Sequence, residues 1–218
     1  MPISNDASLK SSPAETSIRL FRNDFMEALT HVHPIVPLLF WSPVAAWLLW
    51  RSIALHELPA TGLVLIALCG LVVWSLSEYL LHRFVFHYQA TGRIGKYLVF
   101  MFHGVHHAAP RDKTRLVMPP AGAVIVMFGL WQIFRLVVPA PWIEPFCAFF
   151  IIGYLVYDYI HYSTHHFPMK HPLLHFLKVY HLRHHYGTYG KRFGVSSPLW
   201  DRVFGTYPDA EPLSALDS

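Results

Sequence analysis

The sequence predicts an all-α, multi-pass membrane protein whose cytoplasmic helical cap holds a histidine-rich dimetal site. Of the 218 residues, 54% are hydrophobic and only 14% are charged, whereas soluble domains have about a quarter of their residues charged. Four apolar runs are each about long enough to cross a bilayer, and ten of the sixteen histidines fall in closely spaced groups. The length fits one domain, and the composition argues against an ordinary soluble protein.

The chain before the first apolar run is expected to form two short regions. Residues 1–17 are polar and rich in serine, so they predict a disordered leader and not a signal peptide. From position 18 onward, apolar residues recur every three or four positions, namely Ile18, Phe21, Phe25, Leu29 and Val32. This spacing predicts an amphipathic helix over residues 18–33 that lies at the membrane interface.

Four apolar runs predict four transmembrane helices in two hairpins. They span residues 34–55, 61–81, 117–138 and 142–159, and each is close to the ~20 residues that cross a hydrocarbon core. The turns between paired runs are short and contain proline, which ends helices. Residues 34–218 are therefore expected to form one membrane domain with a metal-binding cap outside the bilayer.

The basic residues predict the orientation of these helices. Of the 17 lysine and arginine residues, all but Arg51 and Arg135 lie before the first run, in the central loop or after the fourth run. By the positive-inside rule, both termini and the central loop are then cytoplasmic, in a bacterial inner membrane or the endoplasmic reticulum. The basic residues form no patch interleaved with stacking aromatic side chains, so membrane lipids and not nucleic acids are the expected neighbours.

Ten histidines fall on the same predicted side of the membrane as the termini. They are His82, His87, His103, His106, His107, His161, His165, His181, His184 and His185. In the segments HGVHH, HYSTH and HLRHH, spacings of three or four place two imidazoles on one face of a helix. His82 and His87 are about 140° apart on an ideal helix, so a helix is expected to end or distort between them.

This set of histidines indicates a dimetal centre. Neutral imidazole is a metal ligand at cytosolic pH, and five nitrogens for each of two metals would leave roughly one octahedral position open. The six other histidines are expected to be interfacial or surface side chains and not ligands. They are His31, His33, His56, His166, His171 and His175, of which His175 is the nearest candidate for a further ligand.

Two acidic residues lie close to the histidines in the sequence. Glu78 lies one turn before His82, and Asp158 lies three residues before His161. A carboxylate at either position can accept the second ring N–H of the histidine and orient it toward a metal. The alternative for both acids is a helix-capping or snorkelling role. No catalytic residue beyond the metal centre is expected.

From residue 74 to residue 207, the sequence resembles the fatty acid hydroxylase superfamily of membrane di-iron oxygenases, also called the sterol desaturase family. The matching segments are SEYLLHRFVFH, FHGVHHAAPRDKTRLVMPP, GYLVYDYIHYSTHH and YHLRHHYGTYGKRFGVSSPLWDRVFGTY. All four histidine boxes occur in order. Within the superfamily, the segments are most similar to the fatty acid 2-hydroxylases that act on sphingolipid acyl chains.

The resemblance implies two iron ions held by the ten histidines, with O2 as co-substrate. One metal would be held by His82, His87, His103, His107 and His184, and the other by His106, His161, His165, His181 and His185. The implied reaction inserts one oxygen atom at C2 of a fatty acyl chain, free or in a ceramide-like lipid. Zinc can replace iron in purified protein, because nitrogen sites bind Zn²⁺ more tightly than Fe²⁺.

The source of electrons is expected to be another protein. Eukaryotic relatives often carry an N-terminal cytochrome b5 domain with an HPGG segment, whereas this sequence has only a short polar leader before the first apolar run. The expected donor is therefore separate: a cytochrome b5-like protein, a ferredoxin or a reductase. The same feature hints at a bacterial enzyme.

Other functions are open alternatives on these residues. An acyl desaturase, or a hydroxylase of a sterol or carotenoid, can use the same dimetal scaffold, although usual acyl desaturases have three histidine boxes and HYSTH is a fourth here. A histidine-rich metal transporter is the alternative from a different class. It predicts polar ligands that face one another in mid-membrane, and the second and third runs lack them.

Overall fold

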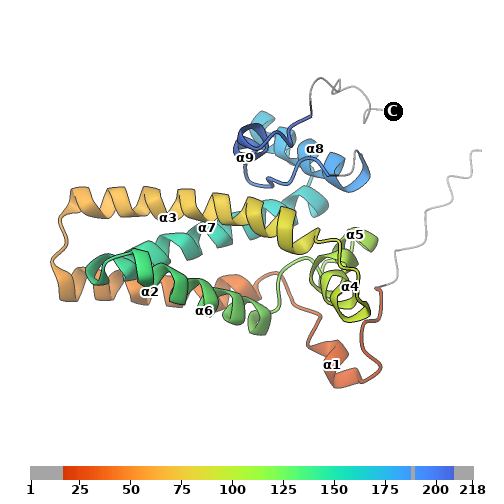
Figure 1. The fold of residues 1–218 in the computed structure, drawn as a ribbon, viewed down its shortest axis with the longest axis horizontal. Helices are drawn as coiled ribbons and strands as arrows, with labels where there is room; N and C mark the ends of the chain where they lie inside the picture. The colour runs from red at the N-terminus through yellow and green to blue at the C-terminus, as the bar shows by residue number, and fades with distance from the viewer. Residues whose placement is uncertain (1–16, 188–189, 209–218) are drawn as a thin grey trace, which may run out of the picture.

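The structure, a computed structural model, describes residues 17–187 and 190–208, and all the regular elements in this part of the chain are helices (Figure 1). The predicted leader therefore lies outside the described residues except for Ser17. In chain order the elements are α1 Asp24–Ala28, α2 Val36–His56, α3 Ala60–Leu80, η1 Leu81–Phe86, α4 Arg93–Val99, η2 Phe100–Gly104, α5 Val105–Ala108, α6 Pro120–Val137, α7 Ala140–His166, α8 Pro172–Tyr186 and α9 Leu199–Val203.

Four helices are long and apolar enough to cross a membrane, as predicted: α2, α3 with its continuation η1, α6 and α7. Figure 1 shows them side by side in an elongated bundle, with α4, α5, α8 and α9 gathered toward one end. The α3–η1 helix and α7 each have 27 residues, or about 40 Å at 1.5 Å per residue. Since a hydrocarbon core is about 30 Å thick, both helices extend past it.

Helix α7 forms the centre of the bundle. Thirteen of its residues are buried, against five of α2, four of α3 and two of α6. The most extensive helix interfaces are those of α7 with α3 and with α2. Trp74 of α3 packs edge-on against Phe150 and Tyr154 of α7, with ring centroids 5.1 and 5.3 Å apart.

The outer faces of the long helices are apolar and exposed. Leu39 of α2, Leu65 of α3 and Leu136 of α6 are 66%, 68% and 84% exposed. Soluble monomers rarely expose contiguous apolar surface on this scale, whereas a hydrocarbon environment solvates it. These faces therefore fit contact with lipid.

Proline determines where the long helices begin. Pro59, Pro119 and Pro139 are the N-cap residues of α3, α6 and α7, where the missing N–H costs no helical hydrogen bond. Helix α2 ends at His56 and α6 ends at Val137, which agrees with the turns expected from the proline positions.

Two π-helical segments interrupt the regular helices where histidines occur. The segment η1 lies between Leu81 and Phe86 and is followed by His87, so the expected distortion between His82 and His87 is confirmed. A second segment, η2, contains His103 and was not predicted. The wider turn of a π-helix changes the angle between successive side chains, and such segments are frequent at functional sites.

The amphipathic helix predicted over residues 18–33 is much shorter in the structure, because only Asp24–Ala28 is helical. The Asn23 side chain accepts the N–H of Met26 at 3.0 Å and so begins the helix there. The Glu27 carboxylate accepts the N–H groups of Leu20 and Phe21 at 2.9 and 2.8 Å, and this holds the preceding residues in a non-helical conformation. We refer to residues 17–32 as the arm.

Gly70 provides a test of the α3–α7 interface. A Cβ atom at this position would lie 2.8 Å from the backbone oxygen of Phe146 in α7, which cannot move aside as a side chain would. We expect Gly70→Ala to lower the unfolding temperature of the purified protein in detergent, at a cost of about 1–3 kcal/mol. The control is Gly129→Ala on α6, which has open space around it and gains helix propensity. Equal unfolding temperatures for the two variants would contradict this packing.

Candidate metal centre

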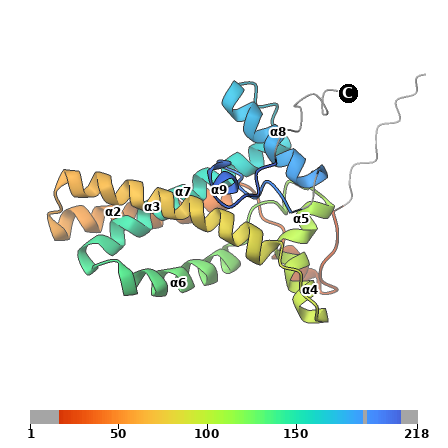
Figure 2. The same ribbon diagram turned by 45° about the horizontal axis from the view of Figure 1, so that its top comes forward.

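Three parts of the chain carry the ten singled-out histidines to the same end of the bundle. His82 and His103 lie in η1 and η2, and His87 directly follows η1. The other seven histidines come from α5, the end of α7, and α8. Figure 2 shows α8 crossing the end of α7, with α5 beside it. The site is therefore assembled where the two longest helices project beyond the rest of the bundle.

The ten side chains form two compact groups. The first histidine group is His82, His87, His103, His107 and His184, and the second histidine group is His106, His161, His165, His181 and His185. Within each group, one nitrogen atom of every ring lies within 4.8 Å of those of the other four. This division coincides with the one that the resemblance implied. The adjacent residues His106 and His107 belong to different groups, because successive side chains on a helix diverge by about 100°.

Within each group, the Nε2 atoms point at one another. In the first histidine group, Nε2 of His103 lies 3.0 Å from Nε2 of both His82 and His107, and the same distance separates His184 from His87. In the second histidine group the corresponding contacts measure 2.9 to 3.1 Å. Five nitrogens facing one centre is the arrangement of a metal site.

The ring tautomers strengthen this interpretation. The Nδ1–H group of His82 donates to the backbone oxygen of Phe193 at 2.5 Å, and that of His184 donates to the backbone oxygen of Lys191 at 2.9 Å. A neutral imidazole that donates from Nδ1 has a lone pair on Nε2. Lone pairs that face other ring nitrogens at 3.0 Å need a cation between them, so these residues fit a bound metal ion.

The nitrogen–nitrogen distances also favour a coordination geometry. With metal–nitrogen bonds of about 2.1 Å, ligands at 90° are separated by about 3.0 Å, whereas ligands at the tetrahedral angle are separated by about 3.4 Å. The observed 2.9 to 3.1 Å contacts match the first value. Five such ligands on one metal ion would leave one octahedral position open for a substrate.

Burial keeps these imidazoles neutral. It lowers the pKa of His87 to about 4 and that of His107 to about 2, and the repulsion between neighbouring imidazoles adds to this effect. The same cause, burial first, lowers the pKa of the other histidines beyond the long helices, namely His103, His106, His181, His184 and His185. Only the neutral ring binds a metal ion, so these histidines can coordinate metal ions at neutral pH without first losing protons.

Glu78 makes no hydrogen bond to His82 in the described structure, although the sequence suggested one. Its carboxylate accepts hydrogen bonds from the backbone N–H groups of Val195 at 2.6 Å and Ser196 at 2.8 Å, and from the Ser196 hydroxyl. The segment that it anchors carries the Phe193 carbonyl, and this carbonyl is the partner of the His82 ring. Glu78 therefore positions His82 through a segment more than a hundred residues away in the chain.

Asp158 likewise makes no hydrogen bond to His161 in the described structure. It is buried within α7, and its Oδ2 atom has no partner among the described residues. The six remaining histidines lie outside both groups, as expected, and are His31, His33, His56, His166, His171 and His175. His175, the nearest candidate, is exposed on α8.

Asp201 is a positioning residue that the sequence analysis missed. It is fully buried and accepts the N–H groups of Phe193 and Gly194 at 2.8 and 2.7 Å, which fixes the carbonyl that holds His82. A Cβ atom at Gly194 would lie 2.1 Å from the Ser197 oxygen, so this turn needs glycine. The available signal was that Asp201 is the only acidic residue between positions 159 and 208.

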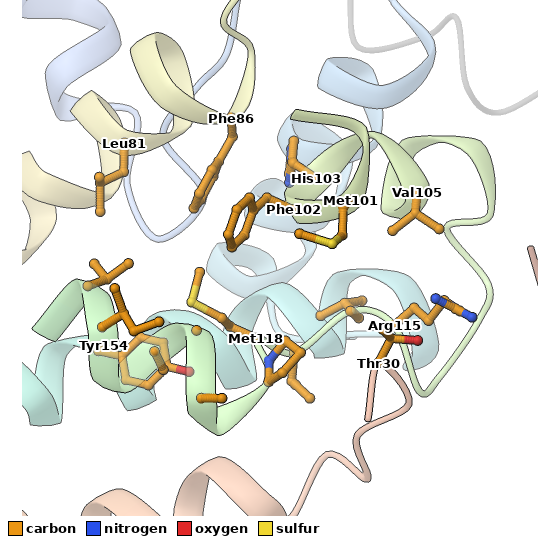
Figure 3. Close-up of a pocket in the computed structure, with 18 of the residues that line it drawn as sticks. Thr30, Leu81, Phe86, Met101, Phe102, His103, Val105, Arg115, Met118 and Tyr154 are labelled. Atoms are coloured by element: carbon orange, nitrogen blue, oxygen red, sulfur yellow. The ribbon is translucent and has the colours of Figure 1, made fainter. Parts of the chain in front are cut away.

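An apolar cavity of about 510 Å³ reaches both histidine groups. His103 of the first group and His161 of the second both line it. Figure 3 shows Phe86 and Phe102 on one side of the cavity and Met118 on the other. This volume and lining are typical of a ligand pocket. The two histidine groups can therefore act on an apolar molecule held in the cavity.

A second, smaller cavity of about 310 Å³ approaches the groups from another side. Its lining includes five of the ten histidines: His87, His103, His107, His184 and His185. His103 therefore lies between the two cavities. The histidine groups are therefore open to the apolar cavity and to a second cavity to which five imidazoles contribute.

The helical bundle and the two groups define a membrane protein with a histidine-rich centre that can hold two metal ions. Residues 67–206 match the family model described as fatty acid hydroxylase. The chain is 40% identical over 195 residues to a dihydroceramide fatty acyl 2-hydroxylase of Arabidopsis thaliana, covering 87% of this chain and 80% of that protein. This chain belongs to the fatty acid hydroxylase family.

Further relatives and a solved structure agree with this assignment. The chain is 39% identical to the ceramide very long chain fatty acid hydroxylase of Saccharomyces cerevisiae, covering 92% of this chain and 52% of that one. It is 33% identical to the human fatty acid 2-hydroxylase, with coverages of 92% and 59%. The structure of full-length scs7p, in which only the hydroxylase domain is visible, matches with a TM-score of 0.80 at 38% identity, covering 87% of this chain and 72% of that one.

Removing Glu78 tests whether the distant segment positions His82. We expect Glu78→Ala to weaken metal binding at the first histidine group by about 10–100-fold, since losing an outer partner of a ligand has this effect. Competition with a chelator measures the affinity. Glu57→Asn, which removes a carboxylate from the exposed α2–α3 turn at a residue with φ of 44°, serves as the control. Unchanged metal affinity in Glu78→Ala would show that the segment does not support the site.

Removing one ring tests the ligand assignment. His107→Ala deletes a member of the first histidine group, and we expect the metal content per chain to fall to about half of the wild-type value. Elemental mass spectrometry on the purified protein measures this content. The matched control is His175→Ala, which removes an exposed histidine from α8. A wild-type metal content in His107→Ala would remove this residue from the ligand set.

Proposed function

We propose that this chain is a membrane fatty acid 2-hydroxylase, which inserts one oxygen atom from O2 at C2 of a fatty acyl chain, free or in a ceramide-like lipid. The main support is the opening of both histidine groups onto one apolar cavity. The relatives named as dihydroceramide or fatty acid 2-hydroxylases support the choice of reaction and substrate. The balanced reaction is RCH2–COX + O2 + 2e⁻ + 2H⁺ giving RCH(OH)–COX + H2O.

The two histidine groups are proposed to hold two iron ions, one in each group. When bound, iron supplies the redox chemistry that O2 reduction requires, which zinc lacks. The residues supply neutral nitrogen ligands in a fixed arrangement, with His82 and His184 oriented by backbone carbonyls. Zinc is expected to compete in overexpressed protein, because nitrogen sites bind it more tightly than Fe²⁺.

The apolar cavity is proposed to hold the acyl chain. Met127 and Leu130 of α6 line the cavity together with Met118, which lies just before that helix, and Tyr154 of α7 lines it as well. These side chains bind methylene groups and exclude water, which leaves the carbonyl end of the acyl chain near His103 and His161. C2 is adjacent to that carbonyl, so the cavity presents the reacting carbon to the histidine groups without removing the whole lipid from the membrane.

We also propose a membrane arrangement for the chain. The four long helices cross the bilayer as two hairpins, with both termini, the cap and the histidine groups on the cytoplasmic side. Residues 79–111 and 159–200, which carry the ten histidines, contain nine lysine and arginine residues and no aspartate or glutamate. Such a surface favours anionic lipid headgroups, and residues 34–218 then form the hydroxylase domain.

The two electrons are proposed to come from a separate protein, such as a cytochrome b5-like protein, a ferredoxin or a reductase. The second cavity, lined by His87, His107 and His185, gives the side from which such a donor can approach the histidine groups. The acid-free sequence around it favours a donor with an acidic surface, because complementary charge accelerates association.

The expected product is a 2-hydroxy fatty acid. A host that expresses this chain should contain hydrolysed fatty acids heavier by one oxygen atom, and fragmentation should place that oxygen at C2. Growth under isotopically heavy O2 should transfer the label to the product. The product should be absent with His184→Ala and present with His175→Ala, since only the first belongs to a histidine group.

Two other outcomes would change the proposal. A product with the oxygen at another carbon, or with a new double bond, would assign another reaction to the same centre. No product, with iron and a reductase system supplied and the protein present in the membrane, would contradict 2-hydroxylation of the host's acyl chains.

A further inference from the structure

The arm, residues 17–32, forms part of the wall of the apolar cavity. Leu20, Phe21, Met26, Leu29 and Thr30 all line it. The remaining lining residues of the cavity come from the long helices and from residues 101–119. Removing the arm would therefore open this end of the cavity. In Figure 3, Thr30 lies beside Arg115 at this end.

The arm also presents apolar side chains outward. Phe25 is 71% exposed, and Met26 and Leu29 are 43% and 55% exposed although both also line the cavity. Arg19 and Arg22 lie among these residues in the sequence. Exposed aromatic and aliphatic side chains beside basic ones are typical of segments that lie in the headgroup region of a bilayer. The arm thus separates the cavity from the place where a lipid substrate would reside.

The helix of the arm is held mainly by polar contacts, because none of the residues of α1 is buried, and one arginine supplies three of these contacts. The Arg115 side chain is only 1% exposed, and its guanidinium donates to the Glu27 carboxylate. It also donates to Ser17 Oγ at 3.1 Å and to His31 Nε2 at 2.8 Å. All three acceptors belong to the arm, so this one buried side chain makes more of the arm's hydrogen bonds than any other described residue outside it; Thr114 and Tyr97 supply others, through His31, Val32 and Leu20.

The partners of Arg115 are themselves fixed by a chain of hydrogen bonds. The Thr114 hydroxyl donates to Asp112 Oδ1 at 2.7 Å, so His31 Nδ1–H donates to Thr114 Oγ1, also at 2.7 Å. His31 Nε2 is then free to accept from Arg115. Each contact in this chain then joins one donor to one acceptor, from the Arg115 guanidinium at one end to the Asp112 carboxylate at the other. His31 is therefore part of the arm attachment.

Burial alone would raise the pKa of Glu27, but the backbone N–H groups of Phe21 and Leu20 and the Arg115 guanidinium bring the pKa down to about 2. The carboxylate is thus ionised at neutral pH, and the attachment is closed in the resting protein. Because α1 has no buried residue and is held by polar contacts, this part of the arm opens at lower free energy than the packed bundle, while Val32 anchors the end of the arm.

We propose that the arm is a strap that covers the entrance through which lipid enters and leaves the cavity. The Glu27–Arg115 pair sets how often the strap opens. This inference rests on the proposed function, because the occupant of the cavity is taken to be an acyl lipid. The lipid diffuses from the bilayer beneath the exposed apolar residues of the arm and reaches the histidine groups once the pair has separated. The pair therefore controls exchange of substrate and product and does not take part in the reaction.

The test measures lipid exchange and arm motion in the metal-loaded full-length protein in lipid nanodiscs. The probe is cis-parinaric acid, a fluorescent fatty acid, and excess oleate displaces it in a stopped-flow instrument. Glu27→Gln keeps the shape of the side chain and removes its charge. We expect its probe dissociation to be about tenfold faster than that of the wild type. Hydrogen exchange of residues 17–32 should rise as well, while the metal content stays unchanged.

The matched control is Asp24→Asn, which removes an acidic charge from the same helix. Asp24 pairs with Arg19 at the surface, and its side chain is 91% exposed. Both readouts should stay within about twofold of the wild type, since exposed ion pairs contribute little. If Glu27→Gln does not fold, Tyr97→Phe provides a milder change, because it removes only the hydrogen bond from the Tyr97 hydroxyl to the Leu20 carbonyl.

Three results would overturn the proposal that the arm acts as a strap. Faster hydrogen exchange in residues 17–32 with unchanged probe dissociation would mean that the arm moves without controlling lipid exchange. No change in either readout would mean that Glu27 does not hold the arm. Failure of the wild type to bind the probe would show that the cavity does not hold an acyl chain. The 2-hydroxylation product is measured independently in whole cells, so failure of the strap and failure of the proposed function are distinguishable.

Discussion

The structure depends on holding ten neutral imidazoles in two groups whose Nε2 atoms face one another at about 3.0 Å. Without cations this arrangement is repulsive, because ring lone pairs converge and burial keeps protons away from them. The fold must therefore supply rigid support from several directions. Two π-helical segments, the end of α7 and the whole of α8 provide it, and backbone carbonyls orient His82 and His184.

The membrane and the site are linked by the two longest helices. The α3–η1 helix and α7 each have 27 residues, which is longer than a hydrocarbon core is thick, and each carries histidines near its C-terminal end. The same helices pack closely within the bundle, where Gly70 lets α3 approach the backbone of α7. A displacement of α3 against α7 would therefore move His82 relative to His161. Packing between these two long helices thus affects the geometry of the histidine groups.

The arrangement places an apolar cavity between the bundle, the histidine groups and the arm. For the proposed acyl substrate, this cavity lies next to both histidine groups, where the carbonyl end has to be placed. The arm is attached by hydrogen bonds and ion pairs, whereas the cavity is lined by apolar side chains. The arm can therefore detach without disrupting the packing of the cavity walls. The bundle provides stability, whereas the weakly buried arm provides access.

The sequence alone determined the helical class, the four long helices and the ten histidines, because hydrophobic runs and spacings of three or four are local signals. It also located the distortion between His82 and His87. The tertiary structure decided the role of Glu78, the contribution of Asp201 and the short extent of α1. Each of these depends on hydrogen bonds between segments distant in the chain, such as Glu78 with Val195, and no local pattern specifies which partner a buried carboxylate finds.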